Sequence, residues 1–167
     1  DWAVTPPNLL WTIERGQGYA CPAVAEDRLV YTHRVGNDVH VDCHDPESGA
    51  RYWRRSFPCD YRGRYISDNG PRATPIIHRG RVYVHGVDGR LTCFELSTGR
   101  TIWEREVSKE LGVPDNFFGV VASPIIYGDT LIQNVGAPGG PCVVAFDLET
   151  GRIVWGSGDE WGPSCAS

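Results

Sequence analysis

Apolar residues come in short runs along the chain, and glycine, proline and aspartate separate these runs. Between residues 39 and 44 apolar and polar side chains alternate, so Val39, Val41 and Cys43 face one side of a strand while two histidines and Asp42 face the other. A period of two is typical of a β-strand. Similar short runs occur at residues 28–31, 81–84 and 130–133. The pattern therefore predicts an all-β chain of short strands.

An eleven-residue pattern occurs three times, at residues 43–53, 93–103 and 145–155. Each copy is predicted to be a strand, a tight turn and a second strand. An acidic residue closes the first strand, and a glycine takes the positive φ that a tight turn requires. These residues are Asp45, Glu95 and Asp147, followed by Gly49, Gly99 and Gly151. A steady period of about fifty residues indicates a repeat architecture.

A tryptophan lies four residues after each of these glycines, at Trp53, Trp103 and Trp155. A large ring at the same place in every repeat is expected to pack neighbouring units together, because tryptophan buries so much apolar area. Each repeat also opens on a similar segment, at residues 20–24, 73–77 and 122–126. One unit therefore holds four short antiparallel strands, which is typical of a β-propeller blade.

The copy at residues 145–155 matches the pattern Ala-x-Asp-x-x-Thr-Gly-Lys-x-x-Trp, with Arg152 in place of lysine. The other copies depart from it at Cys43, Ser48, Ala50, Cys93 and Glu95. Over about residues 8–167 the chain resembles the PQQ-like (quinoprotein-type) β-propeller repeats. The resemblance implies a partial propeller domain, an open ring of about three blades, over residues 1–167. The expected parts are blades at 19–57, 72–107 and 121–157, a lone strand at 8–13 and the start of another blade at 164–167.

Three blades cannot close a ring, since the smallest propellers have about four. We therefore interpret the chain as part of a longer protein, or as a unit whose open blade edges self-associate. The net charge of −5, with both signs interspersed, argues against a nucleic-acid groove. The sequence contains no apolar stretch long enough to span a membrane. Of the six cysteines, Cys43 and Cys93 replace Ala145 and are expected to be small buried residues.

The segments that connect the blades, at residues 54–71, 104–120 and 156–163, are expected to share one face of the propeller. They are rich in aromatic, arginine and amide side chains, which favour an interaction surface. The predicted binding residues are Tyr61, Arg62, Arg64, Tyr65, Asn69, Asn116, Phe117, Phe118, Glu160 and Trp161. In the alternative interpretation, Phe117, Phe118 and Trp161 only fill gaps between blades. Capture of carbohydrate or peptide on the same rim is a further alternative.

The sequence gives only weak signals for catalytic or metal-binding groups. His40, Asp42 and His44 share one face of a strand, but Phe94 and Phe146 take the place of His44 in the other repeats. We therefore interpret His44 as a packing residue with a polar tip. The glycine runs lack the helix and Lys-Ser or Lys-Thr pair of a phosphate loop. The sequence predicts no catalytic group, no metal site and no cofactor.

Two functions remain open. In the first, the chain resembles non-catalytic PQQ-like repeat proteins of the outer-membrane assembly lipoprotein type, which implies a bacterial, extracytoplasmic scaffold in the periplasm or cell envelope that binds a protein partner. In the second, it is part of a quinoprotein dehydrogenase that oxidises alcohols or sugars with PQQ and calcium. The adjacent cysteine pair that the resemblance implies for such enzymes is absent from this sequence.

Overall fold

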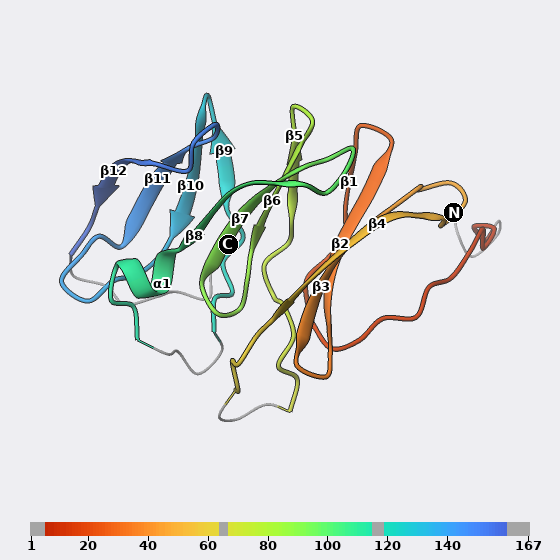
Figure 1. The fold of residues 1–167 in the computed structure, drawn as a ribbon, viewed down its shortest axis with the longest axis horizontal. Coiled ribbons are helices and arrows are strands. Elements are labelled where there is room, and N and C mark those ends of the chain that lie inside the picture. The colour runs from red at the N-terminus through yellow and green to blue at the C-terminus, as the bar shows by residue number, and fades with distance from the viewer. Residues whose placement is uncertain (1–5, 64–66, 115–118, 160–167) are drawn as a thin grey trace.

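Three sheets of four antiparallel strands make up the protein (Figure 1). The computed structural model describes residues 6–63, 67–114 and 119–159. In each sheet the strands follow one another in chain order, from β1 to β4, from β5 to β8 and from β9 to β12. We call these the first, second and third sheets. The predicted all-β architecture, with four short strands in each repeat, is confirmed.

The strands are short, as the apolar runs predicted. The first sheet contains β1 (Ala23–Ala25), β2 (Arg28–Val35), β3 (Asp38–His44) and β4 (Arg51–Pro58). The second contains β5 (Ile76–His78), β6 (Arg81–His85), β7 (Arg90–Glu95) and β8 (Thr101–Glu106), and one helical turn, α1 (Val107–Glu110), follows it. The third contains β9 (Ile125–Tyr127), β10 (Thr130–Asn134), β11 (Val143–Asp147) and β12 (Ile153–Ser157).

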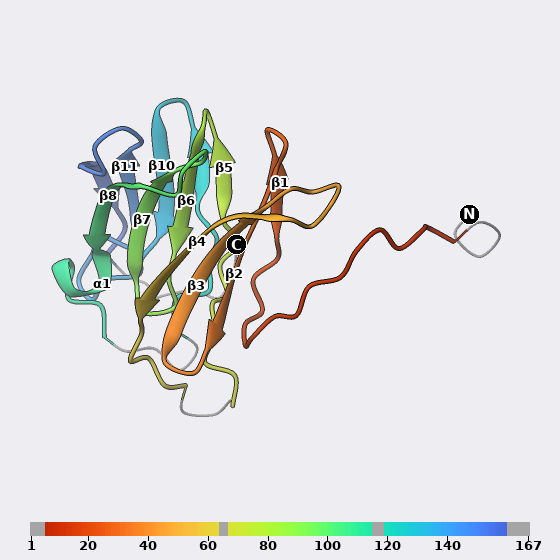
Figure 2. The same ribbon diagram turned by 45° about the vertical axis from the view of Figure 1, so that its right-hand side comes forward.

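The core consists of two apolar layers between neighbouring sheets, which stand side by side like blades (Figure 2). Val41, Cys43 and Trp53 of the first sheet pack against apolar residues of the second. Leu91 and Trp103 of the second sheet pack in the same way against the third. Burying these faces is the main favourable contribution to folding, because a lone amphipathic sheet would leave one of them in water.

Each eleven-residue repeat contains a tight turn that we call a glycine turn, at residues 45–49, 95–99 and 147–151. In each, the glycine N–H donates to the carbonyl oxygen of the acidic residue four positions earlier, at 2.8–2.9 Å. The glycine φ angles are 73°, 69° and 69°. A side chain there would be strained, which explains why glycine recurs at this position.

A tryptophan from the preceding part of the chain lies on each glycine turn. The Trp53 indole N–H donates to Leu96 O at 2.8 Å, and Trp103 donates to Leu148 O at 2.9 Å. The rings lie so close to the glycine α-carbons that a Cβ atom at either Gly99 or Gly151 would come within 2.7 Å of an indole carbon. Each glycine turn therefore offers the indole a carbonyl acceptor and an uncovered backbone surface.

Residues 6–16, which we call the arm, run outside the first sheet (Figure 2). The structure places no strand at residues 8–13, where the sequence predicted one, because no described strand lies beside them to accept their backbone hydrogen bonds. Trp11 nevertheless makes the repeated contact: its indole N–H donates to Pro46 O at 3.0 Å and its ring covers Gly49. The arm therefore places a tryptophan on the glycine turn at residues 45–49, although residues 8–13 form no strand.

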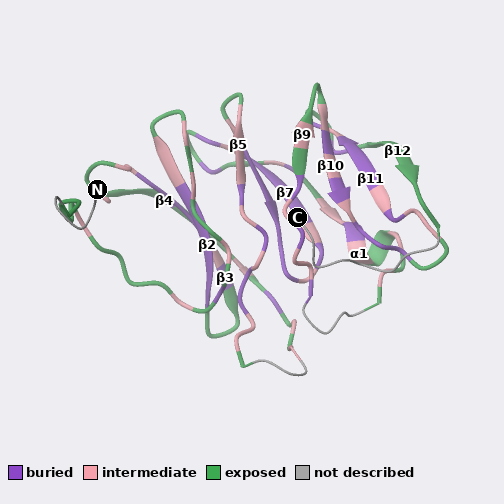
Figure 3. Cartoon of the chain, turned by 180° about the vertical axis from the view of Figure 1, so that it is seen from behind, coloured by how far each residue is buried: buried purple, intermediate pink, exposed green. Residues whose placement is uncertain are grey.

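The two outward faces of the stack of sheets differ in polarity. On the first sheet, Asp42 is buried and accepts hydrogen bonds from Arg54 at 2.6 Å and from His33 Nε2 at 3.1 Å. The other ring nitrogen of His33 accepts the N–H of Gly16 from the arm, at 2.8 Å. On the third sheet, every residue of β12 is exposed, including Trp155 (Figure 3). One face thus carries a polar network around the buried Asp42, and the other carries an apolar edge strand.

Two further predictions concern the membrane and the cysteines. No helix within the described ranges is long and apolar enough to cross a membrane. Cys43 and Cys93 are buried free thiols, as expected for small residues that replace alanine. Burial raises the pKa of both thiols to about 11, so they stay protonated at neutral pH.

Candidate binding pocket at the loop rim

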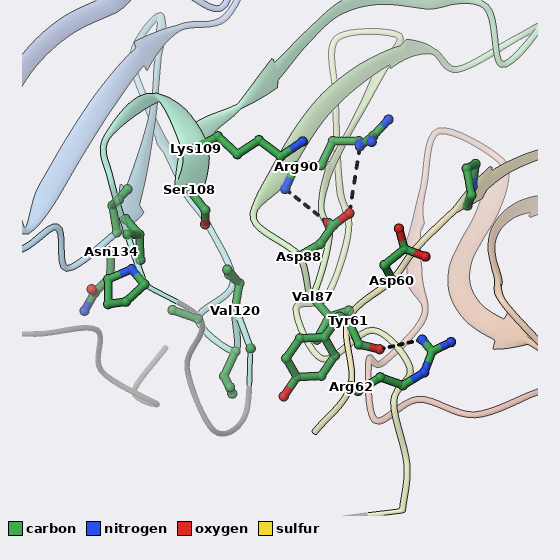
Figure 4. Close-up of a pocket in the computed structure, with 17 residues that line it drawn as sticks. Asp60, Tyr61, Arg62, Val87, Asp88, Arg90, Ser108, Lys109, Val120 and Asn134 are labelled. Carbon is green, nitrogen blue, oxygen red and sulfur yellow. Dashed lines mark hydrogen bonds and ion pairs between the residues drawn. The ribbon is translucent and has the colours of Figure 1, made fainter. Parts of the chain in front are cut away.

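A pocket of about 450 Å³ opens where the connections after β4 and β8 meet the turn between β6 and β7 (Figure 4). Its walls combine charged, hydroxyl and aromatic side chains with short apolar ones. The polar lining residues are Asp60, Tyr61, Arg62, Asp88, Arg90, Ser108, Lys109 and Asn134. The pocket therefore gathers loops that are far apart in the sequence into one concave surface.

Arg34 of β2 holds the first of these loops in place. Its side chain is 2% exposed and donates to Cys59 O at 2.7 Å, to Tyr61 O at 2.9 Å and to Asn69 O at 3.1 Å. Its Nε–H also donates to Gly36 O at 2.9 Å. A guanidinium has five donors in a fixed plane, so one arginine can fix several carbonyl groups that would otherwise be unsatisfied. Arg34 thus holds the backbone at Cys59, Tyr61 and Asn69 by hydrogen bonds.

Two of the predicted rim residues, Tyr61 and Arg62, line this pocket. Asn69 lies in the same loop, but its side chain stabilises the loop backbone, since its side-chain oxygen accepts a hydrogen bond from the N–H of Gly63 at 2.7 Å. The remaining predicted residues lie outside the described residues; they are Arg64, Tyr65, Asn116, Phe117, Phe118, Glu160 and Trp161. Their part in a binding surface therefore stays a prediction.

Sequence reasoning missed six of the polar lining residues, namely Asp60, Asp88, Arg90, Ser108, Lys109 and Asn134. Asp60 precedes a residue that was predicted, and Asp88 lies in a turn expected on the same face, so position along the chain could have indicated both. Arg34 gave no signal, because an arginine within a strand looks like a solvent-facing residue until its carbonyl partners are known.

Two cations of the pocket, Arg90 and Lys109, are paired with carboxylates beside it. Arg90 contacts Glu104 at 3.3 Å and Glu106 at 3.4 Å, and Lys109 also pairs with Glu106. The hydrogen bond from Lys109 lowers the pKa of the Glu106 carboxyl. Arg62 donates to the side-chain oxygen of Asn37 at 2.7 Å. Asp60 is exposed and makes no hydrogen bond or ion pair with any described residue, so its carboxylate is available to a ligand (Figure 4).

The pocket residues do not fit a bound calcium ion. Calcium takes six to eight oxygen ligands, whereas the described lining offers two carboxylates, and Asp88 of these already accepts the N–H of Arg90. Across the described ranges no group of three or more histidine, cysteine or acidic side chains is arranged to hold a metal. The cluster of His40, Asp42 and His44, considered from the sequence, instead places Asp42 against Arg54.

A family model described as outer membrane protein assembly factor BamB matches residues 3–159. The chain belongs to this family. BamB of Burkholderia pseudomallei is 28% identical to this chain over 177 residues, which cover 87% of this chain and 44% of that protein. The 1-butanol dehydrogenase (cytochrome c) of Thauera butanivorans is 27% identical over 178 residues, which cover 93% of this chain and 24% of that protein. The chain thus spans less than half the length of these relatives.

Solved structures agree with the fold. BamB from Moraxella catarrhalis superposes with a TM-score of 0.58 at 22% identity, covering 84% of this chain and 36% of that one. A europium-containing methanol dehydrogenase superposes with a TM-score of 0.64 at 18% identity, covering 89% and 26% respectively. At these identities the likeness shows the β-propeller fold alone. The same blades therefore occur in proteins named as assembly factors and in proteins named as dehydrogenases.

Proposed function

We propose that this chain is a non-catalytic β-propeller scaffold that binds a protein partner in the loop-rim pocket. The observation that carries the proposal is the charged lining of that pocket, on a loop whose backbone Arg34 holds by hydrogen bonds. Arg34 fixes the backbone of the first loop, and Asp60 and Arg62 project charges of opposite sign from it. Charged and aromatic groups on a rigid rim provide specificity for a protein surface.

The class of partner follows from the family. Because a relative is named an outer membrane protein assembly factor, we propose a component of the outer-membrane assembly machinery as the partner. The same relationship supports an extracytoplasmic location, in the periplasm or cell envelope. Fusion of the full-length protein to a reporter enzyme that is active only outside the cytoplasm tests this location. An inactive reporter on a stable fusion protein would contradict it.

The test of partner binding is calorimetric titration of the chain with the soluble domains of that machinery from the same organism. Asp60→Lys and Arg62→Glu each reverse one charge of the pocket and are expected to weaken binding at least about tenfold. Glu14→Lys is the matched control, because it reverses an exposed charge on the arm, and it should leave the affinity unchanged. Equal affinities for all three variants would refute binding at the pocket.

A second candidate function is supported by the named dehydrogenases among the relatives, two of which match 93% and 89% of this chain. In this interpretation the chain is part of a quinoprotein dehydrogenase, and residues outside this chain hold PQQ and calcium. The full-length protein is then expected to show the absorbance of bound PQQ after reconstitution with calcium. An unchanged spectrum at saturating PQQ and calcium would exclude the enzyme.

A further inference from the structure

Two buried polar side chains lie in the seam between the second and third sheets, where the rest of the layer is apolar. His85 ends β6 and Gln133 lies in β10, and these residues are 2% and 0% exposed. His85 is directly opposite Leu91 of β7, which belongs to the apolar layer between the two sheets. Directly opposite residues of an antiparallel pair share one face, so the ring of His85 points into this layer.

The amide of Gln133 has a fixed orientation. Its nitrogen donates to Ala122 O at 3.0 Å and to Asn134 O at 2.9 Å. A primary amide has two N–H donors, so these two bonds use both of them and leave Oε1 as a pure acceptor. This oxygen is buried and makes no hydrogen bond with any described residue. The seam therefore contains an acceptor that requires a donor.

The ring of His85 cannot satisfy its surroundings alone. Burial lowers the pKa of His85 to about 4, so the ring is neutral at neutral pH and has one N–H donor and one lone pair. Two polar neighbours of the ring, the Gln133 side chain and the Gly89 backbone, oppose this shift, and a neighbour that favours the charged ring is an acceptor. The neutral ring thus has one proton for two acceptors.

Unpaired polar atoms therefore gather at one buried place. They are His85 Nδ1, His85 Nε2 and Gln133 Oε1, none of which is hydrogen-bonded to a described residue. Buried polar atoms nearly always have a partner, and ordered water provides it where side chains do not. A molecule with two donors fits this place, because it can bond both the lone pair of the ring and the amide oxygen. Water is the smallest such molecule.

We propose that His85 and Gln133 hold one long-lived water molecule in the seam between the second and third sheets. The water donates one hydrogen bond to the unprotonated ring nitrogen of His85 and the other to Gln133 Oε1. The ring N–H is then left for the backbone carbonyl of Gly89. Two polar partners are the minimum that a buried water requires.

This site lies directly behind the wall of the loop-rim pocket. Ala122 and Asn134, whose carbonyl oxygens hold the Gln133 amide, both line the pocket. Val87, two residues after His85, lines it as well. The water therefore completes a chain of hydrogen bonds that runs from the ring through the amide to the backbone of the pocket wall. The site does not depend on what the pocket binds.

The test counts the long-lived waters of the full-length protein by magnetic relaxation dispersion of the water oxygen nuclei. His85→Phe keeps a planar ring of similar size but removes both nitrogens, and this variant is expected to lose one such water. His40→Phe is the matched control, because His40 lies on the first sheet, where its Nδ1 contacts Ser56 Oγ at 2.6 Å. The control should keep the full count. Circular dichroism checks that both variants fold.

Nitrogen NMR of the histidine rings in the parent protein is the second measurement, and it decides alone if His85→Phe does not fold. At neutral pH the account predicts one protonated ring nitrogen in His85, one that accepts a hydrogen bond, and a nuclear Overhauser effect between the ring and water. An equal water count in the parent and His85→Phe, or an equal loss in His40→Phe, would overturn the proposal. So would a His85 ring protonated on both nitrogens, or a ring nitrogen that accepts no hydrogen bond.

Discussion

The first glycine turn and the second have the same backbone, but different parts of the molecule complete them. At residues 95–99 an arginine that follows the docked tryptophan supplies the donor for the glycine carbonyl, from the neighbouring sheet. At residues 45–49 the donor is His44, from the same sheet as the turn. The glycine carbonyl oxygen therefore accepts a side-chain hydrogen bond in both turns, but the residue that donates it differs. The effect of a substitution at one turn therefore depends on which residue of the neighbouring sheet contacts that turn.

The same contrast extends to the faces around the turns. Phe94 packs in the apolar layer between the first and second sheets, whereas His44 lies 3.9 Å from Asp42 in the polar network of the first sheet. A polar face can be held together by its own ion pairs and does not require a sheet packed against it. The apolar edge at Trp155 has no such alternative, because apolar surface gains only by burial.

The largest expected effect is the difference in stability loss between replacing a buried tryptophan and replacing an exposed one. Trp103→Ala leaves a cavity between the second and third sheets and is expected to lower the free energy of unfolding by about 4 kcal/mol. Trp155→Ala removes a side chain that is already 42% exposed, so a loss below about 1 kcal/mol is expected. Urea denaturation of both variants at low protein concentration measures the difference. Equal losses would contradict the distinction.

The next effect concerns the polar face. Burial alone would raise the pKa of Asp42, but hydrogen bonds from Arg54 and His33 outweigh burial and hold that pKa well below its usual range. The unfolded state therefore binds a proton more readily, and this stabilisation is present above about pH 4 and is lost as the pH falls further. Asp42→Asn leaves Arg54 unpaired and is expected to cost about 3 kcal/mol at neutral pH.

Asp129→Asn is the matched control for this charge, because Asp129 pairs with Arg79 at 2.8 Å but is exposed. Its loss is expected to stay below about 0.5 kcal/mol. Urea midpoints measured between pH 2 and pH 7 should show a weaker acid dependence for Asp42→Asn than for the parent chain. An unchanged slope would mean that Asp42 does not control the acid stability of this face.

The smallest effect tests the donors at the turns. Arg55→Met removes the bonds to Gly99 O and Thr98 O and is expected to cost about 1 kcal/mol of unfolding free energy. Arg100→Met is the control, since the one ion pair of this exposed side chain with a described residue is that with Glu95, at 3.5 Å, and its loss should cost almost nothing. Equal stabilities of the two variants would show that the arginine contact adds nothing to docking.

Much of this fold could be predicted from the sequence, because the repeat, the alternation and the turn glycines are local signals. The position of the tryptophans was also local, although their acceptors lie 35–45 residues away. Arg34 and Asp60 could not be found in this way. The role of Arg34 depends on carbonyl groups 25–35 residues further along the chain, in a loop whose course follows no periodicity. The pocket exists only once three such loops are brought together.

The central claim is that Trp11, Trp53 and Trp103 each dock on the next glycine turn, whereas Trp155 meets no such turn among the described residues. Hydrogen exchange of the indole N–H groups, followed by NMR in dilute protein, tests it most directly. The account predicts strong protection for Trp53 and Trp103, weaker protection for Trp11 on its unpaired arm, and exchange of Trp155 near the rate of free indole. Protection of Trp155 equal to that of Trp103 in the monomer, or an unprotected Trp53, would contradict it.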